Sequence, residues 1–225
     1  MVSVKERKED QSAIVECSAP ILRSLMLTSI SRPGIRLSQN APDEKKVDPQ
    51  WLLERTIENL CLLHLYSPQT LNTDNSPSEY AFQSEFATIM RNLVPLAYPL
   101  LPYKILVEVK EKDESGKRRQ RLDILIRGTS LPSYGFELVV SANEKIFDEH
   151  CERAEKYGEL HKCKMLMVNL CPKVWLHEYF GRRPYALTPV NVVVDPKEKQ
   201  GIIKYAARNE PVSISGSDWD MLFTV

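Results

Sequence analysis

The feature that most constrains this fold is a pair of alternating apolar runs joined by a polar loop. The first run is YKILVEVKE, residues 103–111, and the second is RLDILIR, residues 121–127. In both, an apolar side chain stands at every second position, which is typical of a strand with one buried face. The loop between them, KDESGKRRQ, contains a glycine. The two runs therefore predict an antiparallel β-hairpin.

Helix and strand signals alternate around this hairpin. Before it, SPSE at residues 76–79 combines a capping box with a proline at the first helical position, and apolar residues then repeat at helical spacing up to Pro95. After it, GFELVVS predicts a third strand, residues 143–162 a long helix, and KMLMVNL a strand parallel to the third. The expected α/β core is αβββαβ, a mixed central sheet flanked by helices. VNVVVD and GIIKYAA predict further strands.

The chain before this core is predicted to be an N-terminal extension. Its apolar stretches are few, one of them from Ala19 to Leu27. Asp48 and Pro49 supply an N-cap and a first-turn proline for one helix over about residues 49–65. Because SPQTLNTDNSP is rich in turn residues, we expect the extension at residues 1–75 and the main domain at residues 76–225.

The composition excludes little. The 30 basic and 30 acidic residues give no net charge, so a nucleic-acid role has to rest on local basic patches. The five cysteines are widely spaced without a C-x-x-C pair, which favours a reducing compartment. No apolar run reaches the roughly 18 residues of a membrane span, and MVSVKERKED is too charged for a secretory signal. We therefore expect a soluble chain without a visible signal peptide.

Three carboxylates follow the order of the predicted elements. Leu122, Ile124 and Ile126 are expected to face the core, which places Asp123 on the opposite face of its strand. Glu137 lies likewise on the next strand, and Glu85 lies about 60° from the apolar stripe of the first helix. Each alone is also compatible with a solvated surface position. Together they would bind Mg²⁺ or Mn²⁺, which orients a phosphodiester and lowers the pKa of an attacking water.

The order RLDILI, then FELVV, resembles the D…E-x-K signature of the PD-(D/E)xK, or restriction-endonuclease-like, superfamily over about residues 76–170. The resemblance implies that Asp123 and Glu137 bind the metal, that Glu85 assists, and that the chain hydrolyses phosphodiester bonds as an endonuclease. In that family a lysine two positions after the glutamate helps to activate water. Here Val139 stands at that position.

The helix after the third strand offers replacements for the missing lysine. EHCERAEKY places His150, Arg153 and Tyr157 on one face, beside the buried stripe. With the preceding ELVVSA, this H-x-x-R-x-x-x-Y helix resembles the nuclease-type C-terminal domain of Crinkler proteins of fungi and oomycetes. That resemblance implies an effector that is secreted, acts in a host-cell nucleus, and meets DNA or a host nuclear protein there. A helix face whose polar residues only bond to one another is the alternative.

Two basic segments are candidate contacts for a phosphate backbone. The hairpin loop carries four cations close to Asp123 in sequence: Lys117, Arg118, Arg119 and Arg121. Arg182 and Arg183 stand near aromatic residues that would stack on exposed bases. A solvated turn balanced by acids explains the first segment equally well.

Three hypotheses follow from the sequence. The first is a Mg²⁺-dependent DNA endonuclease, in which His150 or Arg153 replaces the lysine. The second is a degenerate nuclease fold that binds DNA or a host protein without cleavage, for which Val139 is the main indication. The third is a structural or interaction protein in which the three acids never converge.

Overall fold

The chain divides into two compact units, Met1–Gly34 and Ile35–Val225. The computed structural model describes the backbone at residues 2–6, 13–17, 35, 37, 41–42, 45–110, 121–141, 143–172 and 178–216. In the first unit, the strands β1 (Val2–Glu6) and β2 (Ala13–Cys17) pair in antiparallel fashion. The predicted apolar stretch from Ala19 to Leu27 lies outside the described residues.

The second unit contains a seven-stranded mixed sheet with the strand order β3-β4-β5-β6-β7-β8-β9. The pairs β5–β6 and β6–β7 are parallel, and the other four are antiparallel. The strands are β3 (Tyr103–Lys110), β4 (Arg121–Gly128), β5 (Tyr134–Val139), β6 (Lys164–Leu170), β7 (Thr188–Asp195), β8 (Gln200–Tyr205) and β9 (Val212–Ile214).

The predicted order of elements is confirmed from the first long helix to the parallel strand. The helix α4 (Glu79–Ala97) precedes β3, and β3 pairs with β4 as the expected antiparallel hairpin. The helix α5 (Glu144–His161) connects β5 to β6, which are parallel. A helical crossover between parallel strands is the usual connection. The chain is thus a mixed α/β protein.

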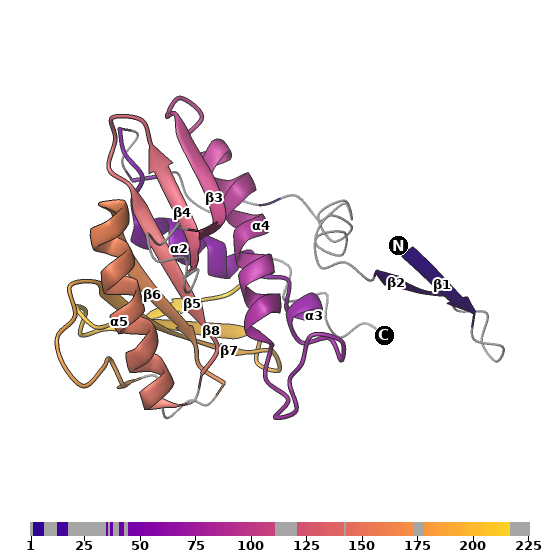
Figure 1. Cartoon of the computed structure of the whole chain (residues 1–225). Coiled ribbons are helices and arrows are strands. Elements are labelled where there is room, and N and C mark those ends of the chain that lie inside the picture. The colour runs from indigo at the N-terminus through magenta and orange to yellow at the C-terminus, as the bar shows by residue number, and fades with distance from the viewer. Residues whose placement is uncertain are drawn as a thin grey trace, which may run out of the picture. The chain divides into compact units, whose positions relative to one another are not determined.

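The helices cover both faces of the sheet (Figure 1). On one face α4 and the helix α2 (Pro49–Glu58) bury their apolar residues against strand residues such as Ile124, Phe136 and Val168. On the other face α5 packs through Phe147, Cys151, Ala154 and Tyr157 on two smaller clusters. Because α2 shares the core with α4, the boundary between the compact units falls after Gly34 rather than near residue 75.

The helix expected over about residues 49–65 is divided into α2 and the short helix α3 (Leu62–Leu65). Asp48 caps α2 as expected, and the side-chain amide of Asn59 then donates to the Arg55 carbonyl at 2.8 Å, which closes the helix. At α4 the N-cap is Ser78 and not Ser76, whose hydroxyl is 2.6 Å from the Asp74 carboxylate. No helix in the described part of the chain is long and apolar enough to span a membrane.

Candidate functional site

Asp123 lies where β4 and β5 separate. The two strands pair up to Ile124 and Phe136, and their ladder ends there. Beyond this point the Asp123 carboxylate links the neighbouring elements. Its Oδ2 accepts the backbone N–H of Leu138 at 2.7 Å, and its Oδ1 accepts a hydrogen bond from Nε2 of Gln83 on α4 at 3.0 Å. Asp123 therefore joins β4, β5 and α4 at one point instead of standing on an open strand face.

The backbone opposite Asp123 is strained. The register of β3 and β4 places Glu108 across from Asp123, yet the ladder contains only the pairs on either side. Glu108 has a φ of 50°, in the left-handed region that non-glycine residues seldom adopt. Strain of this kind concentrates at functional sites.

The side chain of Leu122 lies on a different face of β4 from the one expected. Leu122 packs with Leu125 in the cluster under α5, whereas Ile124 packs in the main core. The expectation that Leu122 and Ile124 share a face is therefore wrong.

Glu137 is fully buried and meets the polar face of α5. Its Oε1 accepts Nε of Arg153 at 2.7 Å and also the terminal Nη2 of the same guanidinium. Nδ1 of His150 is 3.1 Å from this oxygen. Within the described residues, its second oxygen, Oε2, is buried without a hydrogen-bond partner. A buried carboxylate oxygen without a donor is costly unless something else binds it.

The pKa values of Asp123 and Glu137 lie well above those of ordinary carboxyl groups. Burial, then the charge of Glu137, raises the pKa of Asp123 to about 8, against the lowering effect of the Leu138 amide. Burial also raises the pKa of Glu137 to about 7, although Arg153 opposes the shift. Two acids of this kind favour a bound cation, because a positive charge between them stabilises both ionised forms.

The polar residues predicted on α5 all face this pair. Burial and the charge of Arg153 lower the pKa of His150 to about 4, so its ring is neutral at pH 7. Burial and the charge of Glu137 raise the pKa of Tyr157 to about 12, so the phenol keeps its proton. Arg153 bonds Glu137 while its side chain is 37% exposed. His150 and Arg153 contact the Glu137 carboxylate, whereas the Tyr157 hydroxyl has no hydrogen-bond partner among the described residues and its ring packs in the cluster of Leu122 and Leu125.

Arg153 supplies a cation that Val139 does not. Val139 is 1% exposed and packs with Phe147, Cys151 and Met167 in the cluster between β5, β6 and α5. The position of the superfamily lysine is thus occupied by apolar packing. Arg153 lies one turn after His150 on α5, and its partly exposed side chain contacts the Glu137 carboxylate through the guanidinium.

Glu85 has a different set of contacts. It is fully buried, its Oε1 accepts the backbone N–H of Cys61 at 3.1 Å, and its Oε2 is 3.1 Å from Nδ1 of His64. Cys61 is the N-cap residue of α3, so Glu85 stabilises the start of that helix. These contacts tie α4 to α3 rather than to the Asp123 carboxylate.

Sequence reasoning missed two residues on the opposite shoulder of α4. Gln83 donates to Asp123, and the charge of Glu79, one turn earlier, favours the protonated forms of both Asp123 and His150, although the pKa of His150 is lowered overall. At 100° per residue, Glu79 and Gln83 lie about 60° and 100° to one side of Phe82, whereas Glu85 lies about 60° to the other. The helical spacing places polar residues on both sides of the apolar stripe, but it does not indicate which side faces the strands.

The described residues contain no group of three or more His, Cys, Asp or Glu side chains arranged to hold a metal ion. Near the point where they separate, β4 and β5 contribute one carboxylate each, Asp123 and Glu137. Mg²⁺ is commonly bound by one or two carboxylates, with water and substrate phosphates as its remaining ligands. A two-carboxylate site fits that pattern.

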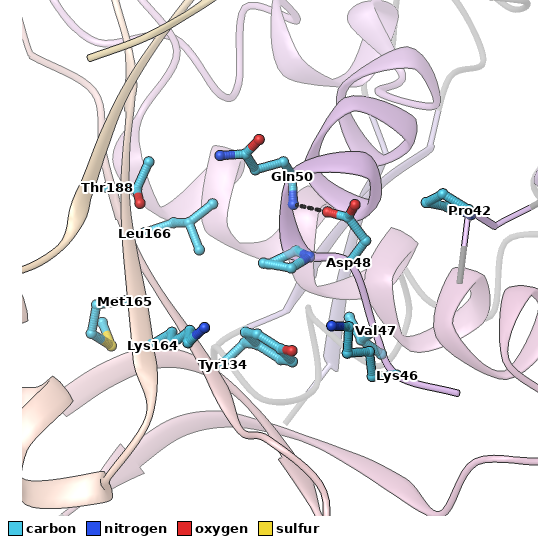
Figure 2. A pocket seen from close by; sticks show the side chains of 11 residues that line it. Pro42, Lys46, Val47, Asp48, Gln50, Tyr134, Lys164, Met165, Leu166 and Thr188 are labelled. Carbon is cyan, nitrogen blue, oxygen red and sulfur yellow. Dashed lines mark hydrogen bonds between the residues drawn. The ribbon is translucent and has the colours of Figure 1, made fainter. Parts of the chain in front are cut away.

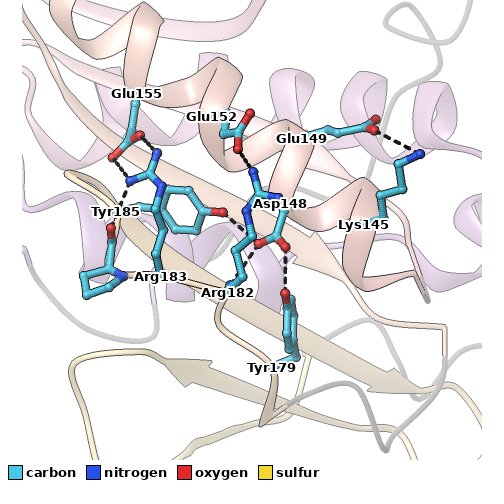
Figure 3. Close-up of polar contacts among 10 residues, drawn as sticks. Lys145, Asp148, Glu149, Glu152, Glu155, Tyr179, Arg182, Arg183 and Tyr185 are labelled. Carbon is cyan, nitrogen blue, oxygen red and sulfur yellow. Dashed lines mark hydrogen bonds and ion pairs between the residues drawn. The ribbon is translucent and has the colours of Figure 1, made fainter.

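The basic residues predicted to contact a phosphate backbone fall into two groups, those outside the described residues and those that already pair with acids. Lys117, Arg118 and Arg119 lie outside the described residues. Arg121 is 3.3 Å from the Glu108 carboxylate. Figure 3 shows that Arg182 and Arg183 pair with Glu152 and Glu155 on α5, and that Asp148 holds the same loop through Tyr179 and Tyr185. These two arginines already have acidic partners, which weakens the case for a phosphate contact there.

Comparison of the chain with protein-family models, with curated proteins and with solved structures found no match. The functional interpretation therefore rests on the residues and contacts described above.

Proposed function

We propose that this protein is a divalent-metal-dependent endonuclease that hydrolyses DNA phosphodiester bonds on a restriction-endonuclease-like core. The observation that carries the proposal is the pairing of Asp123, at the point where β4 and β5 separate, with buried Glu137, whose Oε2 has no partner among the described residues. The order of α4, the hairpin, β5, α5 and β6 supports the same proposal, because it follows the order of the signature elements.

The two carboxylates fit a hard divalent cation. Their oxygens are the ligands that Mg²⁺ and Mn²⁺ prefer. The raised pKa values of Asp123 and Glu137 reflect the unfavourable free energy of a negative charge at these buried positions, which a bound cation would offset. When bound, the ion would supply a nucleophilic water and charge neutralisation at the phosphate. Asp123 and Glu137 would hold it, and Glu79, on the α4 shoulder that faces Asp123, would assist in place of Glu85.

The residues of α5 prepare Glu137 for this role. Arg153 keeps its positive charge at any physiological pH, so it stabilises negative charge on the carboxylate and on an arriving phosphate but does not accept a proton. His150 is neutral at pH 7 because its pKa is about 4, so its ring, 3.1 Å from the Glu137 carboxylate, adds no positive charge there. Gln83 orients the Asp123 carboxylate through its 3.0 Å hydrogen bond.

A degenerate fold that binds DNA or a host protein without cleavage is the second candidate. It is favoured by the apolar packing of Val139 and by the two hydrogen bonds through which Arg153 occupies Oε1 of Glu137. In this alternative Arg153 is a permanent substitute for the metal. The contacts of His150 and Arg153 with Glu137 support the proposed likeness to Crinkler nuclease domains under either candidate.

The test is cleavage of supercoiled plasmid with Mg²⁺ or Mn²⁺, with EDTA as the blank. Three proteins are purified identically: the wild type, Asp123→Asn with Glu137→Gln, and Glu85→Gln. We expect the wild type and Glu85→Gln to nick the plasmid and the double variant to be inactive. A folded wild type that cuts with neither metal would exclude the nuclease, and retention of the plasmid in a mobility-shift assay would then favour the binding alternative.

A further inference from the structure

Three cations lie together at the end of the sheet away from the candidate site. Lys104 on β3 and Arg127 on β4 stand directly opposite each other in the strand register, and both are exposed. Burial raises the pKa of the Cys163 thiol to about 11, and the nearby charge of Arg127 opposes the shift. Lys162, which precedes Cys163, is the exposed C-cap residue of α5. Lys104, Arg127 and Lys162 are called the basic end below.

The basic end has no acidic partner. No ion pair joins its three cations to an acid within the part of the chain that the structure describes, whereas Arg121, Arg182 and Arg183 all have one. The exposed Glu159, three residues before Lys162, makes no ion pair with it. Like charges directly opposite each other on two strands are destabilising. Cations gathered without acids favour a negatively charged partner.

Edge protection does not explain the basic end. β3 is an edge strand, and a lysine on an edge discourages pairing with another chain. That reason applies to Lys104 alone, because Arg127 lies on an inner strand and Lys162 ends a helix. Lys164 is a separate cation: its register partner is Tyr134, and Figure 2 shows the two side chains together in the lining of a pocket beside the start of α2.

The basic end lies a fixed distance from the strand carboxylates. β4 is antiparallel to β5, and α5 returns the chain from the end of β5 to the start of β6, so β4 and α5 run in the same direction (Figure 1). Arg127 follows Asp123 by four residues, about 13 Å of strand. Lys162 follows Arg153 by nine residues, about 14 Å of helix. Both elements therefore place their cations at a similar distance from the candidate site.

This distance suits the backbone of a DNA duplex. Each strand of a duplex carries one phosphate per about 3.4 Å of helix axis, so about 13 Å corresponds to roughly four base pairs. A duplex with one phosphodiester at Asp123 and Glu137 can present further phosphates at the basic end. Lysine binds a phosphate as a point charge, and arginine binds it through its planar guanidinium.

We infer that the basic end is a second DNA contact, at which Lys104, Arg127 and Lys162 bind backbone phosphates about four base pairs from the phosphodiester at the carboxylate site. The inference rests on the proposed action on DNA and holds whether the protein cleaves the duplex or only binds it. Contacts of this kind supply affinity and register without reading the base sequence.

The test is fluorescence anisotropy in EDTA over a range of salt concentrations, with a labelled duplex of about 20 base pairs, which spans both contacts. The variants are Lys104→Gln with Arg127→Gln, and Lys162→Gln. The matched control is Arg91→Gln with Lys197→Gln, an exposed arginine on α4 and an exposed lysine between β7 and β8. Polyglutamate is the polyanion without phosphate. Thermal unfolding verifies that each variant is folded, and plasmid cleavage with Mg²⁺ is measured separately.

We expect the Lys104, Arg127 double variant to bind the duplex at least about tenfold more weakly and to lower the slope of log affinity against log salt by about two. Lys162→Gln should lower that slope by about one, and the control should match the wild type. A folded double variant with unchanged affinity and slope would overturn the inference. So would an equal loss in the control, no duplex binding by the wild type, or equally tight binding of polyglutamate.

The two assays separate this inference from the proposed nuclease. Plasmid cleavage by a wild type whose duplex affinity does not depend on the basic end would overturn the second contact and leave the nuclease standing. Duplex binding that depends on the basic end, in a wild type that cuts with neither metal, would support the second contact and exclude the nuclease.

Discussion

Two glutamates of this protein are equally buried but differently satisfied. Glu85 on α4 and Glu137 on β5 are both 0% exposed. Both oxygens of Glu85 have partners, the amide of Cys61 and the ring of His64. Glu137 has Arg153 and His150 on one oxygen and nothing among the described residues on the other. The first is a structural residue of the α3–α4 contact, and the second retains a free ligand position.

The comparison shows that burial alone does not identify a functional carboxylate. A buried acid whose oxygens are saturated contributes to stability, because its partners would otherwise lose their bonds. A buried acid with a free oxygen and a raised pKa reduces stability and is retained for another reason. Mutations that remove each carboxylate should therefore affect the fold in different amounts.

The largest effect on folding is expected at Glu85. Glu85→Leu leaves the Cys61 amide without its acceptor and should lower the free energy of unfolding by about 3 kcal/mol. Glu137→Leu should lower it by no more than about 1 kcal/mol at pH 8, because it removes a carboxylate that is costly to bury. Urea denaturation of both variants in EDTA measures the difference. Equal losses would contradict the contrast between the two residues.

The second effect is the pH dependence of stability. The folded protein holds protons on Asp123 and Glu137 up to pKa values of about 8 and 7, whereas the unfolded chain releases them near pH 4, so their contribution declines as the pH rises to about 8. His150, with a pKa lowered to about 4, acts in the opposite direction, but only below its unfolded value of about 6.5. Between pH 6.5 and 8 the decline is therefore unopposed.

We expect the free energy of unfolding to fall by about 2 kcal/mol over that interval, roughly one proton's worth of linkage. Denaturant titrations of the metal-free protein at several pH values measure it. The control is Asp123→Asn with Glu137→Gln, which should show no such decline. A wild type whose stability is flat or rises from pH 6.5 to 8 would disprove the assignment of the raised pKa values.

The smallest effect is expected at Gln83, which acts through Asp123. Gln83→Leu removes the 3.0 Å hydrogen bond to Oδ1 and should weaken Mn²⁺ binding about tenfold while the fold stays intact. Asn92→Leu is the matched control, because Asn92 is an exposed amide on the same helix that bonds only to the Thr88 carbonyl in the described residues. If both variants bind Mn²⁺ equally well, Gln83 does not position Asp123.

Much of the fold follows from local patterns, because strand and helix periods are short-range signals. The hairpin, α4, α5 and β6 were predictable for this reason, and so was the adjacency of the two strands that carry Asp123 and Glu137. The choice between Glu85 and Glu79 was not predictable, since both lie about 60° from the apolar stripe and tertiary packing decides which side faces the strands.

The central claim is that Asp123 and Glu137 together hold a divalent cation, and calorimetric titration with Mn²⁺ at pH 7 tests it most directly. Run in two buffers of different ionisation enthalpy, the titration reports both affinity and proton release. The wild type and Glu85→Gln should bind one ion and release about one proton, because the carboxylates must ionise to bind it. Asp123→Asn and Glu137→Gln should bind at least about a hundredfold more weakly. A folded wild type without saturable Mn²⁺ binding, or a Glu137→Gln variant that binds as well, would contradict the claim.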